Sequence, residues 1–136
     1  MGGEDGEYAG VVKKFERIQL GTYPFDMLYT VGTTNEEIIA YLRKSGVELS
    51  DEDIGNIREH VLRSGWTMAL SCGGFVLWLR KAPKTAYTHA VLAHEAFHIT
   101  SFLFSRVNIE HSMASDEAWA YQIEFIVNSL VDKMFS

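Results

Sequence analysis

The chain has 136 residues and a formal net charge of −6, with 47% hydrophobic and 22% charged residues. These values are typical of one globular domain, and we expect a single domain over 1–136 with a flexible start over 1–10. The negative charge argues against nucleic acid or an anionic membrane as a partner, because both usually bind basic patches. The single cysteine, Cys72, excludes an internal disulfide and any multi-cysteine zinc site, and it favours a reducing, cytoplasmic location.

Two segments near the start of the chain are predicted strands. Residues 11–20 alternate only imperfectly between apolar and polar side chains. Residues 25–31 alternate cleanly, which is the period-two pattern of a strand that buries one face. The expected buried residues of this second strand are Phe25, Met27, Tyr29 and Val31.

Two short helices are predicted next. Thr34 and Glu37 form a capping-box sequence, followed by apolar residues at helical spacing and a glycine stop. A second helix is predicted to begin at Ser50 and to end at Gly65. Its expected buried stripe is Ile54, Ile57, Val61 and Leu62. The acidic run at 51–53 complements the helix dipole, so we interpret it as a helix start rather than as a metal site.

A β-hairpin and a long helix follow. Residues 66–70 and 75–79 alternate on either side of a Cys-Gly-Gly turn, and we expect this hairpin to join the earlier strand in a small antiparallel sheet. One of its strands, 75–79, could present an edge to an extended peptide. Residues 86–104 contain no helix breaker and are apolar nearly all round, which predicts a buried helix.

The predicted long helix carries the motif His94-Glu95-x-x-His98. Residues four apart share one face of a helix, so His94 and His98 could bind one metal ion with Glu95 beside it. Zinc suits neutral imidazole, and a site with three protein ligands leaves one position for a water, whose proton Glu95 would accept. We expect both imidazoles to point into the interior, where a metal would satisfy them.

The last predicted helix begins at Ser115 and runs to about Lys133. A polar stripe runs along it, formed by Glu117, Tyr121, Glu124 and Asn128. Two orientations are open for this stripe. It is an ordinary surface if it faces solvent, and it supplies a third ligand and its supporting side chains if it faces the histidines.

The motif and Asp116-Glu117-Ala118-x-Ala120 in the following helix together resemble the gluzincin pattern. The order of strand, hairpin and helix, with "LAHEAFH" and "DEAWAY", is more closely similar to small HExxH proteins of tailed phages and prophages, which are regarded as metallopeptidases. This resemblance is strongest over 75–131. It implies a minimal zincin-like α+β domain, whose sheet packs against the active-site helix and the C-terminal helix, and a place in the cytoplasm of a bacterial host.

Carried over by position, the resemblance implies that His94, His98 and Glu117 bind zinc, with Glu95 as the general base. Asp116 competes with Glu117 for the third position. Larger gluzincins carry an aspartate where this chain has Tyr121, so the hydroxyl of Tyr121 or the carboxylate of Glu124 could orient a ligand. The side chains available to stabilise an oxyanion are His111, Tyr87 and Tyr121.

Two functions follow from these patterns. The first is a zinc-dependent hydrolase, a metallopeptidase acting on a peptide or protein substrate. The second is a zincin-like phage or prophage protein that binds a host protein and has a structural or inactive metal site. A third hypothesis has no metal, with both histidines as polar core residues. An open fourth position at the metal would favour the hydrolase, and a closed one the structural role.

Overall fold

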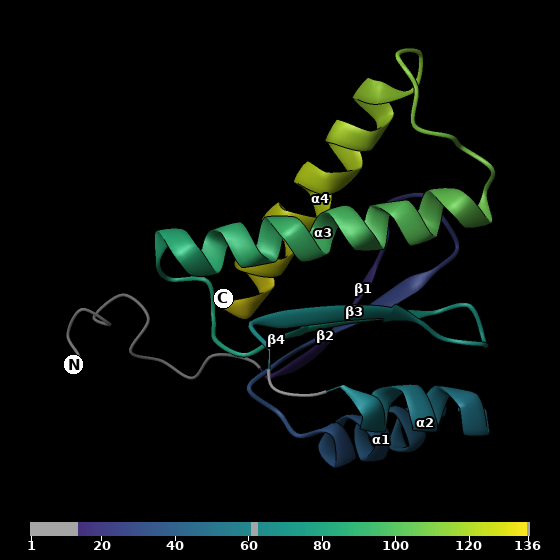
Figure 1. Cartoon of the computed structure of the whole chain (residues 1–136), viewed down its shortest axis with the longest axis vertical. Coiled ribbons are helices and arrows are strands. Elements are labelled where there is room, and N and C mark those ends of the chain that lie inside the picture. Colours follow the sequence, from purple (N-terminus) through teal and green to yellow (C-terminus); the bar gives the residue numbers. More distant parts are fainter. Residues whose placement is uncertain (1–13, 61–62, 136) are drawn as a thin grey trace.

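The computed structural model describes residues 14–60 and 63–135 and shows an α+β fold (Figure 1). A four-stranded mixed sheet lies between two helical layers, with α1 and α2 on one face and α3 and α4 on the other. In chain order the elements are β1 (Phe15–Gln19), β2 (Asp26–Val31), α1 (Asn35–Lys44), α2 (Asp51–Glu59), β3 (Gly65–Ala69), β4 (Phe75–Leu79), α3 (Ala86–Arg106) and α4 (Asp116–Met134).

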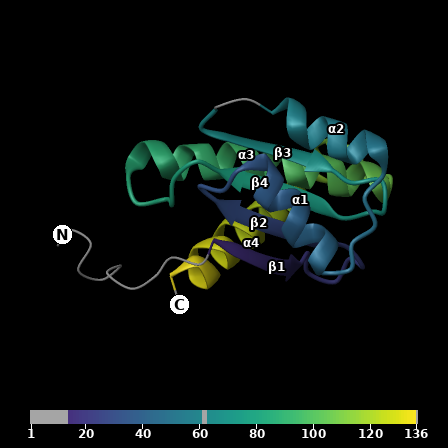
Figure 2. The same cartoon turned by 90° about the horizontal axis from the view of Figure 1, so that it is seen from below.

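The strand order is β1-β2-β4-β3, and the central pair is parallel. The prediction of an antiparallel sheet is therefore wrong for β2 and β4, although β1–β2 and the hairpin β3–β4 are antiparallel. The reason is the connection. After α1 and α2 have passed over one face of the sheet (Figure 2), β3 runs opposite to β2, and the hairpin turns the chain back so that β4 lies beside β2 in the same direction. β4 is consequently an interior strand without a free edge, and the edge predicted for 75–79 belongs to β3.

The sheet separates two apolar cores. Met27, Tyr29 and Val31 face α3 and α4, as the alternation in 25–31 predicted. Leu28 on β2 and Val76 on β4 point the other way, toward α1 and α2. Because both faces of β4 are covered, all five of its residues are buried. Residues 11–13 of the first predicted strand, and the start at 1–10, lie outside the described residues, and β1 itself begins at Phe15.

The two short helices begin with the predicted capping boxes, at Thr34 and at Ser50. Asp53 is buried and joins α2 to the hairpin turn, because its carboxylate accepts hydrogen bonds from Ser50 N at 3.1 Å, Ser71 N at 3.0 Å and Ser71 Oγ at 3.0 Å. The acidic run at 51–53 is therefore a helix start, as predicted.

The predicted end of the second helix is wrong, because α2 stops at Glu59 and Gly65 begins β3. His60 leaves the helix with an extended backbone and stacks on the Trp66 ring, with the ring centroids 4.0 Å apart. Val61 and Leu62, which were expected in the buried stripe, lie outside the described residues.

The long helix α3 is buried on one side only. Its residues Leu92, Ala96, Ile99 and Leu103 pack on the sheet, whereas Phe97 is 46% exposed. The prediction of a buried helix is wrong for the outer face of α3, because α4 covers only one flank and no other described element covers that face (Figure 1). Among the described helices, none combines the length and apolarity that crossing a bilayer requires.

Candidate metal centre

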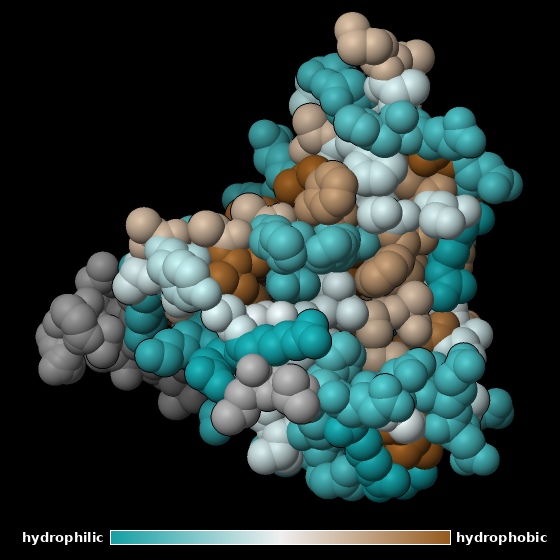
Figure 3. All heavy atoms as spheres, viewed as in Figure 1, coloured by the Kyte–Doolittle hydropathy of each residue, from teal (hydrophilic) through white to brown (hydrophobic). Residues whose placement is uncertain are grey.

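His94 and His98 lie together on the outer face of α3. Figure 3 shows hydrophilic side chains next to hydrophobic ones on this side of the molecule. Their Nε2 atoms are 3.2 Å apart. Two imidazole nitrogens that bind one tetrahedral zinc at about 2.0–2.1 Å are about 3.3 Å apart, so this pair fits zinc as it stands. The prediction that both imidazoles point into the interior is wrong: His94 is exposed and His98 half-buried, since these two residues lie away from the side of α3 that supplies Leu92, Ala96 and Ile99 to the core.

Glu95 is buried between α3 and the edge strand β3. A Cβ on Gly65 would lie 3.1 Å from the Glu95 Cγ, so a glycine at this position allows the two elements to approach closely. Burial raises the pKa of the Glu95 carboxyl; the charges of His94 and His98 and a hydrogen bond with Thr67 oppose this but only partly offset it. A carboxyl whose pKa is shifted toward neutrality is suited to accept and return a proton.

Three adjoining hollows that share lining residues follow β3, and we call them together the β3 groove. The first, of about 340 Å³, lies toward the start of α3, and it shares Gly65, His94 and Glu95 with the central hollow of about 440 Å³. The third, of about 410 Å³, lies toward α2. It shares His60, Arg63, Thr67 and Phe102 with the central hollow. His94, Glu95 and His98 thus line the central one of the three hollows.

The acidic candidates for a third ligand lie at the start of α4. Glu117 is exposed and lies about 200° around the helix from Trp119, which packs against α3. Asp116 is also exposed, and its carboxylate is 3.0 Å from the His111 Nε2. Over 14–60 and 63–135, no three His, Cys, Asp or Glu side chains gather where one ion could bind them. Two of the predicted ligands are thus together and the third is apart.

The polar stripe of α4 faces solvent. Glu117, Tyr121 and Glu124 are all exposed, because the opposite side of α4 supplies Trp119 and Ile126 to the core. Of the two orientations left open by the sequence, the structure therefore has the ordinary surface, and it does not bring Tyr121 or Glu124 to the histidines.

Of the two remaining oxyanion candidates, Tyr87 lies at the groove and His111 makes its contacts on α4. The Tyr87 hydroxyl is 2.7 Å from Ser64 Oγ and lines the groove beside His94 and Glu95. His111 instead packs on Trp119, with ring centroids 5.0 Å apart, and pairs with Asp116. Ser115 stands at the N-cap of α4, as predicted, but its side chain makes no cap hydrogen bond and donates instead to the Glu110 carbonyl.

The residues that form the groove wall opposite the histidines were not predicted from the sequence. It consists of His60 and Arg63 after α2, together with Trp66 and Thr67 on β3. No spacing within 60–67 marks these residues as a site, and their approach to α3 depends on the sheet order. The small residue Gly65, placed between them, was the one available signal, and we interpreted it as a helix stop.

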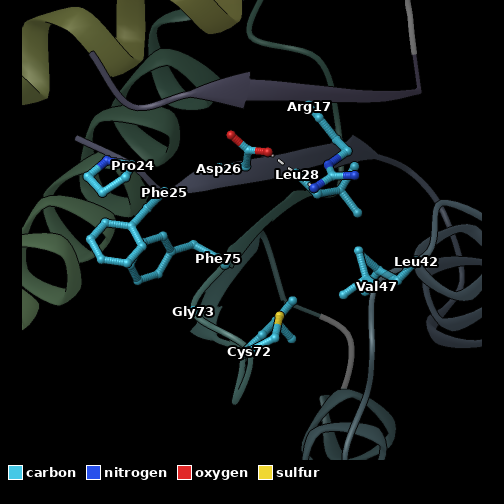
Figure 4. A pocket seen from close by; sticks show the side chains of 12 residues that line it. Arg17, Pro24, Phe25, Asp26, Leu28, Leu42, Val47, Cys72, Gly73 and Phe75 are labelled. Carbon is cyan, nitrogen blue, oxygen red and sulfur yellow. Dashed lines mark hydrogen bonds and ion pairs between the residues drawn. The ribbon is translucent and has the colours of Figure 1, made fainter. Parts of the chain in front are cut away.

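A separate pocket of about 280 Å³ lies between the strand ends and α1 (Figure 4). Its lining includes Leu28, Leu42 and Phe75, and the exposed Cys72 lies on its rim. Arg17 and Asp26 form an ion pair of 3.2 Å beside it, so both charges are already partnered. The pocket shares no lining residue with the β3 groove.

Comparison of the chain with protein-family models, curated proteins and solved structures gives no match. The likeness to phage-encoded HExxH proteins accordingly stays a resemblance carried by the motif residues. The function is therefore inferred from the geometry of the site formed by His94, Glu95 and His98.

Proposed function

We propose that this chain is a zinc-dependent hydrolase, a gluzincin-like metallopeptidase. The observation that carries the proposal is the pair of Nε2 atoms 3.2 Å apart beside a buried glutamate in the middle of a groove. An ordinary surface histidine pair would explain the separation of the nitrogens. It would not explain why the intervening glutamate is 6% exposed in a protein whose other glutamates lie at the surface or half-buried among the described residues.

Zinc, when bound, would polarise a substrate carbonyl and lower the pKa of a water molecule. His94 and His98 would hold the ion through their Nε2 atoms. Glu95 would accept the proton of the attacking water and deliver it to the leaving amine, and Thr67 would orient the Glu95 carboxylate. The groove would hold the substrate, and its free strand edge on β3 would pair with an extended peptide.

Glu117 is proposed as the third ligand, which requires the first turn of α4 to move when the ion binds. Two observations support this proposal: the Ser115 side chain makes no cap hydrogen bond to α4, and Asp116 and Glu117 are both exposed. Trp119 brings this end of α4 near the site, since its ring packs on Phe97, next to His98. Asp116 is the alternative ligand, and it would have to leave His111 first.

A second candidate function is a binding protein with a structural or inactive metal site, acting on a host protein. The separation of Glu117 from the histidines favours it, because a two-imidazole site lacks the usual three protein ligands. Exposed apolar side chains at Met113, Tyr121 and Phe125 also favour it, since they offer contact surface on α4 and the loop before it.

Hydrolysis by the wild type and Glu95→Gln distinguishes the two functions. Both proteins would be loaded with zinc and given a degenerate pool of quenched fluorescent peptides. We expect measurable cleavage by the wild type and a rate lower by about 10²- to 10⁴-fold for Glu95→Gln, because the general base is lost. Zinc content should be equal in both. Equal rates would contradict the hydrolase proposal, and zinc binding without any cleavage would favour the binding protein.

A further inference from the structure

The wall of the β3 groove that faces the histidines carries one cationic side chain, Arg63, among the described residues that line its central hollow. Arg63 also lines the hollow toward α2. His94 and Glu95, in contrast, line the central hollow and the hollow toward the start of α3. Arg63 therefore lies on the α2 side of the proposed reaction centre.

The guanidinium of Arg63 is exposed, and over 14–60 and 63–135 it has no hydrogen bond or ion pair. Two other arginines, in contrast, are engaged. Arg58 binds Glu36 through two hydrogen bonds of 2.8 and 3.0 Å, and Arg106 donates to the Leu70 carbonyl at 3.1 Å. The unengaged group lies where a bound chain would pass.

The field of Arg63 reaches the groups around it. Burial raises the pKa of the Glu95 carboxyl overall, and the charge of Arg63 is one of the smaller effects that oppose this rise. It also contributes, after burial, to the lowered pKa of His60, while Glu59 acts in the opposite direction. The aromatic residues Trp66 and Phe102 line the same hollow.

We propose that Arg63 is a specificity residue that binds a carboxylate of the substrate on the α2 side of the reacting bond. This inference rests on the proposed function, since it assumes a peptide lying along the β3 groove. A guanidinium presents paired N–H donors that match the two oxygens of a carboxylate. The carboxylate can come from an aspartate or glutamate side chain or from the C-terminus of the substrate.

Peptide binding to the full chain in the Glu95→Gln background tests the proposal, because this variant should bind without cleaving. The probes are three fluorescent degenerate heptapeptide pools of neutral residues, measured by fluorescence anisotropy with zinc present. One pool has a fixed central glutamate and an amidated end, the second a fixed central glutamine and an amidated end, and the third a fixed glutamine and a free C-terminal carboxylate.

We expect the glutamate pool or the free-carboxylate pool to bind about fivefold more tightly than the neutral pool, as one exposed charge pair would give. Whichever pool gains affinity identifies the source of the carboxylate. Arg63→Gln should abolish the gain. Arg43→Gln, which removes a charge from α1 on the other face of the sheet, should retain it. No gain with either carboxylate, or a gain that survives Arg63→Gln, would overturn the proposal.

Failure of the Arg63 proposal can be distinguished from failure of the hydrolase proposal. A gain in affinity that depends on Arg63, together with an inactive wild type, would support the assignment of Arg63 and count against hydrolysis. Cleavage that depends on Glu95 with no role for Arg63 would do the reverse.

Discussion

The neighbours His94, Glu95 and His98 occupy very different environments although they lie within five residues. The imidazoles are on the outer face of α3, whereas the Glu95 carboxyl lies against β3. This follows from helix geometry, because Glu95 is rotated by about 100° from His94, toward the sheet. Imidazoles on the outer face can take up an ion from solvent, and a buried carboxyl is suited to proton transfer.

The third ligand can be identified by comparing Glu117→Ala with Asp116→Ala. We expect zinc affinity to fall by at least about tenfold in Glu117→Ala, because the site loses its anionic ligand, while Asp116→Ala keeps zinc and only releases His111. Competition with a chromophoric chelator measures both affinities. The opposite pattern would make Asp116 the ligand. Unchanged affinity in both variants would exclude both carboxylates as the third ligand.

The contribution of the Asp53 carboxylate to the stability of the fold can be tested independently of any metal. Burial raises its pKa, but the hydrogen bonds from Ser50 and Ser71 outweigh this and hold the pKa below its usual 3.8. The ionised form therefore stabilises the folded state above about pH 3.8, and this contribution is lost as the pH falls through the lower folded-state pKa.

Asp53→Asn should lower the free energy of unfolding by about 1–2 kcal/mol at pH 7. The difference from the wild type should shrink below pH 3.8, where the wild-type carboxyl protonates. Urea unfolding at several pH values measures it. Asp51→Asn is the control, since Asp51 is exposed in the same helical turn. A difference that grew on acidification would refute this role for Asp53.

At the scale of elements, the contact between α3 and β3 positions the site. A Cβ at Gly65 would meet Val91 Cγ1 at 3.0 Å, Glu95 Cγ at 3.1 Å and the Trp78 carbonyl at 3.1 Å. No larger side chain fits without moving Glu95 or the hairpin. The same glycine thus lets the edge strand pack and lets the catalytic candidate be buried.

Gly65→Ala should destabilise the fold by about 1–3 kcal/mol through overpacking, and it should also reduce any hydrolytic activity by displacing Glu95. Gly55→Ala is the matched control. Gly55 lies inside α2 with nothing within 4 Å of the added Cβ, so we expect it to stabilise the fold by about 0.5–1 kcal/mol. Thermal unfolding of both variants decides the matter, and a neutral Gly65→Ala would show that β3 and α3 are not held in close contact.

The elements that local signals specify were predicted well. Thr34 and Ser50 cap their helices as their spacing to Glu37 and Asp53 indicated, and the hairpin turns where its glycines stand. The parallel pairing of β2 with β4 could not be predicted, because it depends on which strand of the hairpin lies beside β2: β4 runs parallel to β2, whereas β3 runs opposite to it.

The orientation of α3 and α4 was likewise beyond sequence reasoning. An almost uniformly apolar helix does not show which side a neighbour will cover, so the exposure of His94 was missed. The stripe that begins at Glu117 left both orientations open for the same reason. Arg63 was missed because the groove it lines is formed only when β3 becomes the sheet edge beside α3.

At the scale of the whole molecule, the apolar cores that stabilise the three-layered fold are separate from the candidate site. The α1–α2 layer closes one face of the sheet, and the α3–α4 layer closes the other with a separate apolar core. The candidate site lies outside both cores, where α3 passes the edge strand. Because His94 and His98 contribute little to either core, substituting them should leave the fold intact, which makes metal binding testable by itself.

The most direct test is the zinc content of protein purified without a histidine tag. We expect about one zinc per chain in the wild type after equilibration with zinc and gel filtration, lost with a chelator and restored by adding zinc. The double variant His94→Ala, His98→Ala should bind none and remain folded by circular dichroism. His89→Ala, an exposed histidine of α3 outside the motif, should bind as much as the wild type. A wild type without zinc, or a double variant with undiminished zinc, would contradict the assignment of this site.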